Sequence, residues 1–174
     1  MSEESSISAY HQNEFSWIRC AGKGNFLNSP LLKEWCEREI ENGATCLVID
    51  LEDCHGMDST FMGTMAGLAI KLMKVPDGKL QIADPGDRNR QSLQDLGLDV
   101  MMQIDPIDTC WRGLVSDIRS KLTVCQPGQE KINQGTHVLD AHRKLCEADA
   151  RNTQKFGTLL DYLEAEVKAK DSSR

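Results

Sequence analysis

The sequence is poor in aromatic residues and in clustered positive charge. Aromatic residues make up 5% of its 174 positions, and 27 acidic residues against 20 basic ones give a formal net charge of −7. Domains that bind nucleic acid usually carry a patch of Lys and Arg, and no such patch with interleaved aromatic residues occurs here. We therefore expect no nucleic-acid partner, and a basic or zwitterionic protein surface suits this chain better.

Long apolar runs are also missing. A membrane-spanning helix needs about 18 or more consecutive apolar residues, and no segment of the chain approaches that length. The first residues, MSEESS, have neither the basic nor the apolar region of a signal peptide. The seven cysteines are an odd number without a C-x-x-C pair, which favours reduced and mostly buried thiols over a disulfide framework. We expect a cytoplasmic protein with no membrane association.

The motifs of common catalytic sites are absent as well. The chain contains no G-x-x-x-x-G-K-[ST] loop, no H-E-x-x-H helix and no nucleophile elbow. His142 and Cys146 are four positions apart with His137 nearby, but a zinc site needs further ligands and the sequence offers no second pair. We expect a protein that is not an enzyme and that holds neither a metal nor a cofactor.

Hydrophobic residues make up 40% of the chain and charged residues 27%, which is typical of a globular protein with a substantial core. Short apolar runs alternate with segments of helical periodicity, an order typical of an α/β fold. Ser29 before Pro30 has the pattern of a helix N-cap. The predicted strands are 15–20, 46–51, 79–83 and 101–104, and the predicted helices are 30–43, 61–73, 88–96 and 107–122.

Composition divides the chain into four parts. We expect a flexible N-terminus over 1–13, an α/β domain over 14–126, a linker over 127–135 and a C-terminal helical extension over 136–170. The extension carries an interrupted apolar stripe with charges opposite, which predicts a helical hairpin or a kinked helix. Such a stripe must be covered, either by the chain's own core, which we favour, or by a second copy in a homodimer.

One loop carries a distinctive pattern. The segment LEDCHGMDSTFMG, residues 51–63, follows the most apolar predicted strand and leads into a methionine-rich helix. Asp58 and Ser59 are ordinary N-cap residues, so capping alone explains the D-S-T sequence. The exposed amides of a helix N-terminus also favour negative charge, so a phosphate added to Ser59 or Thr60 would be held there. The spacing of these residues does not decide between the two interpretations.

The strand, the loop and the D-S-T sequence together resemble the STAS family, and in particular the anti-sigma-factor antagonists of bacteria. In the antagonists a D-S-[ST]-G-x-G segment carries a serine, directly after the aspartate, that a partner kinase phosphorylates. Ser59 and Thr60 match the two hydroxyl positions, Gly63 matches the second glycine, and Phe61 replaces the first. The resemblance covers about residues 14 to 124. It implies an α/β core of about four to five strands in a mixed sheet with about four helices.

The resemblance also implies a function. Unphosphorylated protein would bind an anti-sigma factor that is a serine kinase, and phosphorylation of Ser59 would release it, with ATP and magnesium bound by the kinase and a PP2C-type phosphatase reversing the reaction. Asp58 would orient the loop, and Gly63 would let the helix pack closely. The implied phosphoacceptors are Ser59 and Thr60, and the implied partner-binding residues are Asn25, Asp58, Ser59, Thr60, Phe61, Met62 and Gly63.

Other interpretations of this region stay open. The loop could be a docking surface without phosphorylation, in a constitutive scaffold or a subunit associated with a transporter. His55 could assist phosphotransfer, although a loop histidine is usually only solvated. The methionines at 57, 62, 65 and 73 could form an adaptable docking patch, but methionines at helical spacing are usually core residues.

Overall fold

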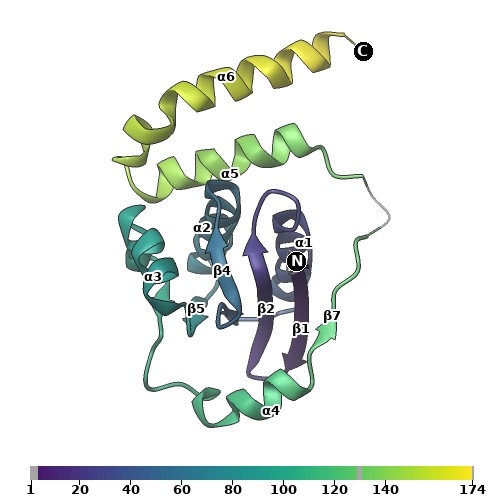
Figure 1. Cartoon of the computed structure of the whole chain (residues 1–174), viewed down its shortest axis with the longest axis vertical. Coiled ribbons are helices and arrows are strands. Elements are labelled where there is room, and N and C mark those ends of the chain that lie inside the picture. Colours follow the sequence, from purple (N-terminus) through teal and green to yellow (C-terminus); the bar gives the residue numbers. More distant parts are fainter. Residues whose placement is uncertain (1–3, 129–130, 174) are drawn as a thin grey trace.

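The computed structural model describes residues 4–128 and 131–173. Within these residues seven strands form one mixed sheet with the order β6-β5-β3-β2-β1-β7, and β4 pairs with β2 beside this path (Figure 1). The strands are β1 (Ser6–Gln12), β2 (Phe15–Gly24), β3 (Cys46–Asp50), β4 (Cys54–Met57), β5 (Lys79–Ala83), β6 (Gln103–Ile104) and β7 (Thr123–Val124). The predicted class, a mixed α/β sheet with a C-terminal helical extension, is confirmed, with more strands than the four or five expected.

The direction of the strands places their carboxyl ends at one edge. The strands β2, β3, β5 and β6 are parallel, whereas β1 runs antiparallel to both β2 and β7. The predicted central strand, β3, is buried along its whole length between β2 and β5. In such sheets the loops that follow the strands form the natural binding edge. The D-S-T sequence lies at this edge, where β4 ends at Met57 and α2 begins at Ser59.

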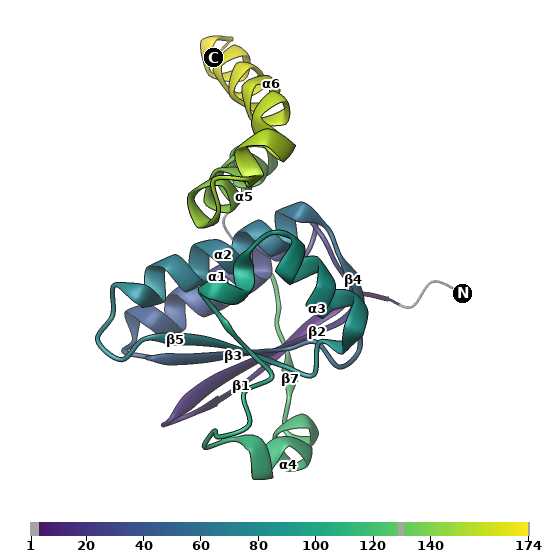
Figure 2. The ribbon, with the colours of Figure 1, turned by 90° about the vertical axis from the view of Figure 1, so that its left-hand side faces the viewer.

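Helices cover the two faces of the sheet unequally (Figure 2). The main core lies under α1 and α2, and residues alternate along each strand, so that Ile18 and Ile49 face this core while Trp17 and Val48 face a smaller one on the other side. The helices are α1 (Ser29–Glu41), α2 (Ser59–Met73), α3 (Gly86–Asp95), α4 (Val115–Ser120), α5 (Gln134–Ala148) and α6 (Asn152–Ser172).

A buried carboxylate holds α4 on the side of the sheet where the smaller core lies. Asp50, at the end of β3, is inaccessible to solvent and accepts two hydrogen bonds from the Arg119 guanidinium, both of 3.0 Å, and one of 3.0 Å from Arg19. The indole N–H of Trp17 donates a fourth, of 3.2 Å. A buried charge is tolerated when it is paired and fully hydrogen-bonded, as Asp50 is. This network stabilises the fold, and the Asp50 carboxylate already has its hydrogen-bond partners within the chain.

Two segments differ from their sequence predictions. The N-terminus expected to be flexible over 1–13 contains β1, in which Ile7 and Ala9 are buried and alternate with more exposed neighbours; residues 1–3 are outside the described part. The alternation of apolar and polar residues in this segment involves too few apolar residues to predict a strand from the sequence. The helix predicted over 107–122 is confined to α4 after a short 3-10 turn at Arg112–Leu114, and Ile107 is 89% exposed. Pro106 and Gly113 break the apparent periodicity.

The C-terminal extension forms the predicted hairpin. The helices α5 and α6 run antiparallel, joined by a turn in which Asp149 accepts a hydrogen bond of 2.9 Å from the backbone N–H of Arg151. The helix α5 packs directly on α2, and α6 lies on the outer side of α5 (Figure 2). The predicted burial against the chain's own core is thus confirmed for α5, whereas α6 packs mainly on α5. The predicted linker, 127–135, ends earlier than expected because α5 begins at Gln134, and its residues 129–130 are outside the described part.

Candidate switch site

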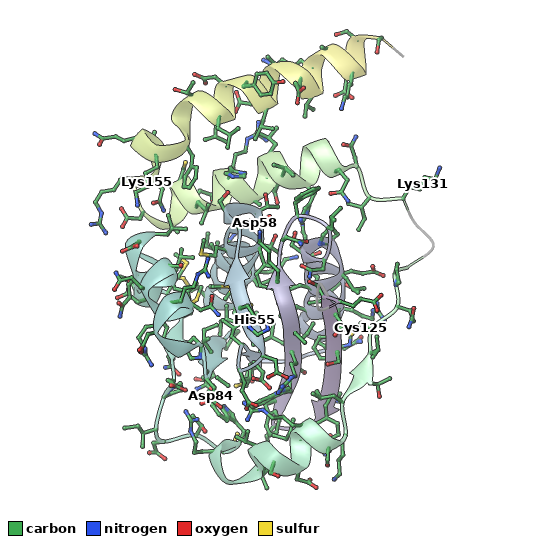
Figure 3. The ribbon with its side chains drawn as sticks, in the orientation of Figure 1. His55, Asp58, Asp84, Cys125, Lys131 and Lys155 are labelled. Atoms are coloured by element: carbon green, nitrogen blue, oxygen red, sulfur yellow. The ribbon has the colours of Figure 1, made fainter. Side chains whose placement is uncertain are left out.

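The segment after β3 turns back into the short strand β4 before α2 begins. This strand pairs in parallel with the end of β2, where Gly24 lies opposite Met57. The next residue, Asp58, donates its backbone N–H to the carbonyl of Gly24 at 2.9 Å. In Figure 3 Asp58 lies where β4 and β2 end, below α5. The start of α2 is therefore fixed at the edge of the sheet and not held on a free loop, although the sequence predicted only a loop here.

The Asp58 carboxylate joins two segments. It caps α2 by accepting the backbone N–H of Phe61 at 2.8 Å, as the sequence predicts for an N-cap residue. Its second oxygen accepts the backbone N–H of Phe26 at 2.9 Å, from the loop between β2 and α1. One carboxylate therefore holds the start of α2 and the loop between β2 and α1 together.

Asn25 shapes the same loop. Its side-chain oxygen accepts the backbone N–H of Leu27 at 2.9 Å, and the backbone N–H of Asn25 donates to the side-chain oxygen of Asn28 at 2.9 Å. The next two residues are exposed although both are apolar: Phe26 is 45% accessible and Leu27 is 67% accessible. Adjacent exposed apolar side chains beside a candidate site favour a protein contact. Sequence reasoning missed both, because their exposure is visible only once the loop is folded.

Ser59 is the first residue of α2, and its hydroxyl is engaged. The Oγ atom lies 2.9 Å from Nε2 of His142 on α5. The other ring nitrogen of His142 lies 2.7 Å from the carbonyl of Val138, which can only accept, so Nδ1 carries the proton of the neutral ring. Nε2 is then the acceptor, and the Ser59 hydroxyl donates its hydrogen to it. His142 is 2% exposed, and its ring packs edge-on against Phe156 with 5.3 Å between centroids.

The three residues after Ser59 are buried in this conformation. Thr60 is 5% exposed, Phe61 is inaccessible and Met62 is 8% exposed. Phe61 stands where the antagonist motif has a glycine, and its ring occupies space above Gly24, where an added Cβ would come within 2.8 Å of the ring. The ring of Phe61 therefore fits only because residue 24 has no side chain. Any contact of Phe61 with a partner needs a change in the packing.

Gly63 marks the closest approach of α2 and α5. A Cβ built at Gly63 would lie 2.2 Å from the backbone oxygen of Ala141, so no other residue fits there without a shift of α5. At Gly67, one turn later, a Cβ would lie 3.2 Å from the flexible side chain of Lys144. The close packing expected of Gly63 is realised against the C-terminal extension.

A second serine–histidine pair lies nearby. Ser29, the first residue of α1, is inaccessible, and its Oγ lies 2.8 Å from Nε2 of His137 on α5. Burial lowers the pKa of His137, and the positive charge of Lys33 lowers it further. The sequence predicts Ser29 at the N-cap position, but α1 begins at Ser29 and Asn28 occupies that position. Both histidines that the sequence offers as possible zinc ligands lie within hydrogen-bond distance of serine hydroxyls.

Two acidic residues of the segment before β4 pair with arginines. Glu52 and Asp53 are in the turn before β4, where Arg19 and Arg119 pair with them, and β4 separates them from Ser59. Asp58 is the carboxylate that adjoins the serine. Within residues 4–128 and 131–173, no cluster of three or more His, Cys, Asp or Glu side chains is arranged to hold a metal ion. In the same residues no helix has both the length and the apolar character to cross a membrane.

Comparison with known proteins identifies the family. The chain matches the STAS domain model over residues 6–109, whereas a search of curated proteins gave no match. An anti-sigma factor antagonist from Mycobacterium paratuberculosis is 18% identical, with a TM-score of 0.51 and coverage of 67% of this chain and 95% of that one. The antagonist SpoIIAA in its unphosphorylated form is 18% identical, with a TM-score of 0.50 over 64% of this chain and 96% of its own. The phosphorylated form of SpoIIAA, from Bacillus, is 21% identical, with a TM-score of 0.51 and coverage of 64% and 99%. At these identities the solved structures show a shared fold alone, and the family match decides the assignment: the chain belongs to the STAS domain family.

Proposed function

We propose that the protein is a phospho-regulated binding module. In its unphosphorylated form it binds an anti-sigma factor that is also a serine kinase, and phosphorylation of Ser59 releases this partner. The observation that carries the proposal is the position of Ser59: it is the first residue of α2, directly after an aspartate that caps the helix, in the D-S-T sequence of a STAS domain. SpoIIAA, which shares the fold, exists in phosphorylated and unphosphorylated forms.

The chemistry of this position supports the proposal. A phosphate at a helix N-terminus is stabilised by the free amides of the first turn. It adds a charge of about −1.5 to −2 next to the carboxylate of Asp58, and burying such a charge under a partner is strongly unfavourable. The α2 helix thus tolerates the modification while an interface over Ser59 does not. Thr60 is a minor acceptor in this proposal, because its side chain is 5% exposed whereas Ser59 is half-buried.

The rest of the system follows from the same proposal. The kinase supplies ATP and magnesium, a PP2C-type phosphatase restores the unphosphorylated protein, and the chain itself performs no catalysis. The surface for the partner comprises Asn25 and residues 58–63, to which we add Phe26 and Leu27. The seven free thiols suit a reducing compartment, and we place the protein in the cytoplasm.

One observation favours the alternative, a constitutive STAS-type scaffold or transporter-associated subunit. The hydroxyl of Ser59 is already bonded to His142, so the loop could serve as a permanent contact without modification. Incubation with ATP, magnesium and lysate from the organism of origin, followed by mass spectrometry, separates the two functions. The switch predicts phosphate on Ser59 that is lost in Ser59→Ala and kept in Ser29→Ala. An unlabelled wild-type protein in lysate that labels other substrates would favour the scaffold.

A further inference from the structure

The helix α5 lies across the first turns of α1 and α2. His137 and His142 are five positions apart on α5, and their Nε2 atoms lie 2.8 and 2.9 Å from the hydroxyl oxygens of Ser29 and Ser59. Each serine is the first residue of its helix, so α5 is attached where both helices begin. Ser59 is therefore covered by a distant part of its own chain.

The contact is an extensive helix–helix packing and not a pair of isolated hydrogen bonds. On α5, Ala141 is 3% exposed and Leu145 is inaccessible, and Leu145 belongs to the main hydrophobic core. On α2, Gly63 and Gly67 lie one turn apart on the same face and have no side chains, which lets the two backbones approach closely. Two glycines one turn apart on one face of a helix allow a second helix to cross it at short distance, as α5 does here.

The second helix of the extension holds α5 in place. Phe156 of α6 packs on the ring of His142, and the side chain of Asn152 donates to the carbonyls of Leu96 and Leu145 at 2.9 and 2.8 Å. Lys155 of α6 also donates to the carbonyl of Asp95 at 3.0 Å. The hairpin is thus anchored both to the start of α2 and to the end of α3.

We infer that the first half of α2 is a helix-docking surface that α5 occupies within the same chain, and that a protein partner reaches Ser59 by inserting a helix in place of α5. This partner role rests on the proposed function, whereas the covering of Ser59 does not. The backbone of α5 lies against Gly63 at Ala141, so a partner helix in the same place would also need a small residue at that position. The extension therefore blocks access to Ser59 until a competing helix displaces α5.

The neighbouring loop indicates what a partner gains over α5. Phe26 and Leu27 remain exposed beside the docked α5, and the backbone of Phe26 is bonded to the same Asp58 that caps α2. A partner that covers these two side chains in addition to the α2 surface buries apolar area that α5 leaves in water. That additional burial would favour displacement of the helix bound in cis.

The covering of Ser59 can be measured without a kinase or a partner. In a full-length Ser59→Cys variant, the new thiol is labelled with N-ethylmaleimide and followed by peptide mass spectrometry, with exposed Cys110 and buried Cys36 as internal references. A second change, Ala141→Glu, places a charge in the α2–α5 contact. Ala165→Glu, the same substitution on an exposed position of α6, is the matched control.

We expect the thiol introduced at position 59 to react at least about tenfold more slowly than Cys110, because labelling requires local opening of α5. Ala141→Glu should bring its rate close to that of Cys110, and Ala165→Glu should not change it. Hydrogen exchange of Cys46–Asp50 must stay slow in every variant, which shows that the core remains folded; if Ala141→Glu unfolds it, the pair His137→Ala and His142→Ala replaces that variant. If the introduced thiol reacts as fast as Cys110 in the Ser59→Cys protein without a second change, the covering of Ser59 is overturned.

The partner half is tested by phosphorylation of the full-length chain with native Ser59 in lysate. Ala141→Glu should accelerate labelling of Ser59 relative to wild type, and Ala165→Glu should not. If labelling is equally fast in all three while the thiol assay shows protection, α5 does not compete with the kinase and the inference fails. If no protein is labelled while the thiol assay shows protection, the proposed function fails and the covering of Ser59 stands.

Discussion

The starts of α1 and α2 carry the same contact in different surroundings. In each case the first residue is a serine whose hydroxyl meets Nε2 of a histidine on α5, at nearly equal distance. Ser29 is inaccessible to solvent, whereas Ser59 is half-buried and follows an aspartate that caps its helix. The shared contact attaches α5 to the core, and the differences between the two serines are the reason why the proposed function places the phosphate on Ser59.

The largest difference should come from adding a negative charge at each serine. Ser29→Asp buries a carboxylate in place of an inaccessible hydroxyl, and we expect it to lower the free energy of unfolding by about 3–5 kcal/mol. Ser59→Asp adds its charge at a half-buried helix N-terminus, which favours anions, and should cost about 1 kcal/mol or less. Urea denaturation measures both. Equal losses of unfolding free energy in the two variants would show that the surroundings of Ser29 and Ser59 do not differ as described.

Two glycines on α2 allow a sharper test of the packing of α5. Gly63→Ala places a Cβ against the backbone of Ala141 and should cost about 1–3 kcal/mol, because α5 must shift. Gly67→Ala meets only the flexible side chain of Lys144, and its better helix propensity should offset the contact to within about 1 kcal/mol. Thermal unfolding and hydrogen exchange over 134–148 report both changes. A Gly63→Ala protein as stable as Gly67→Ala would contradict the close crossing.

A smaller effect should follow from pH. The pKa of His137 is lowered by burial and by Lys33, so the unfolded chain takes up the proton before the folded one does. The contribution of neutral His137 to stability is therefore complete well above the ordinary pKa of about 6.5 and declines as the pH falls below it. We expect His137→Gln, which keeps a hydrogen-bonding group near Ser29, to reduce the loss of thermal stability between about pH 7.5 and about pH 5.5. A variant with the same pH profile as wild type would exclude His137 as its source.

Local patterns predicted much of the core. Residues 46–50 and 79–83 are buried strands as expected, and Asp58 caps α2 as its position before Ser59 predicts. The same patterns failed where tertiary contacts decide the structure. The strand β1 depends on pairing with β2, and the apparent helix over 107–122 gave way to a turn that buries Trp111, whose indole N–H donates to Gln81 at 2.7 Å.

The candidate site was predictable only in part. The local D-S-T sequence predicts Asp58 as the N-cap of α2, which the structure confirms, whereas the role of Ser59 as phosphoacceptor comes from the family resemblance and stays a prediction. The contact of Ser59 with His142 joins residues 83 positions apart, and no local pattern carries that information. The sequence places a histidine on the apolar stripe of the extension. Whether this histidine contacts a metal, the core or a hydroxyl depends on how α5 packs on α2 at Gly63, which the sequence does not show.

The central claim is that phosphate on Ser59 controls partner binding, and titration calorimetry tests it most directly. The kinase identified by labelling is titrated with unmodified protein, with protein phosphorylated on Ser59, and with Ser59→Ala as a control for loss of the hydroxyl. We predict that phosphorylation weakens binding at least about tenfold, since the charge must be desolvated beside Asp58, and that Ser59→Ala binds at least as well as wild type. Equal affinity of the phosphorylated and unmodified proteins would contradict the switch.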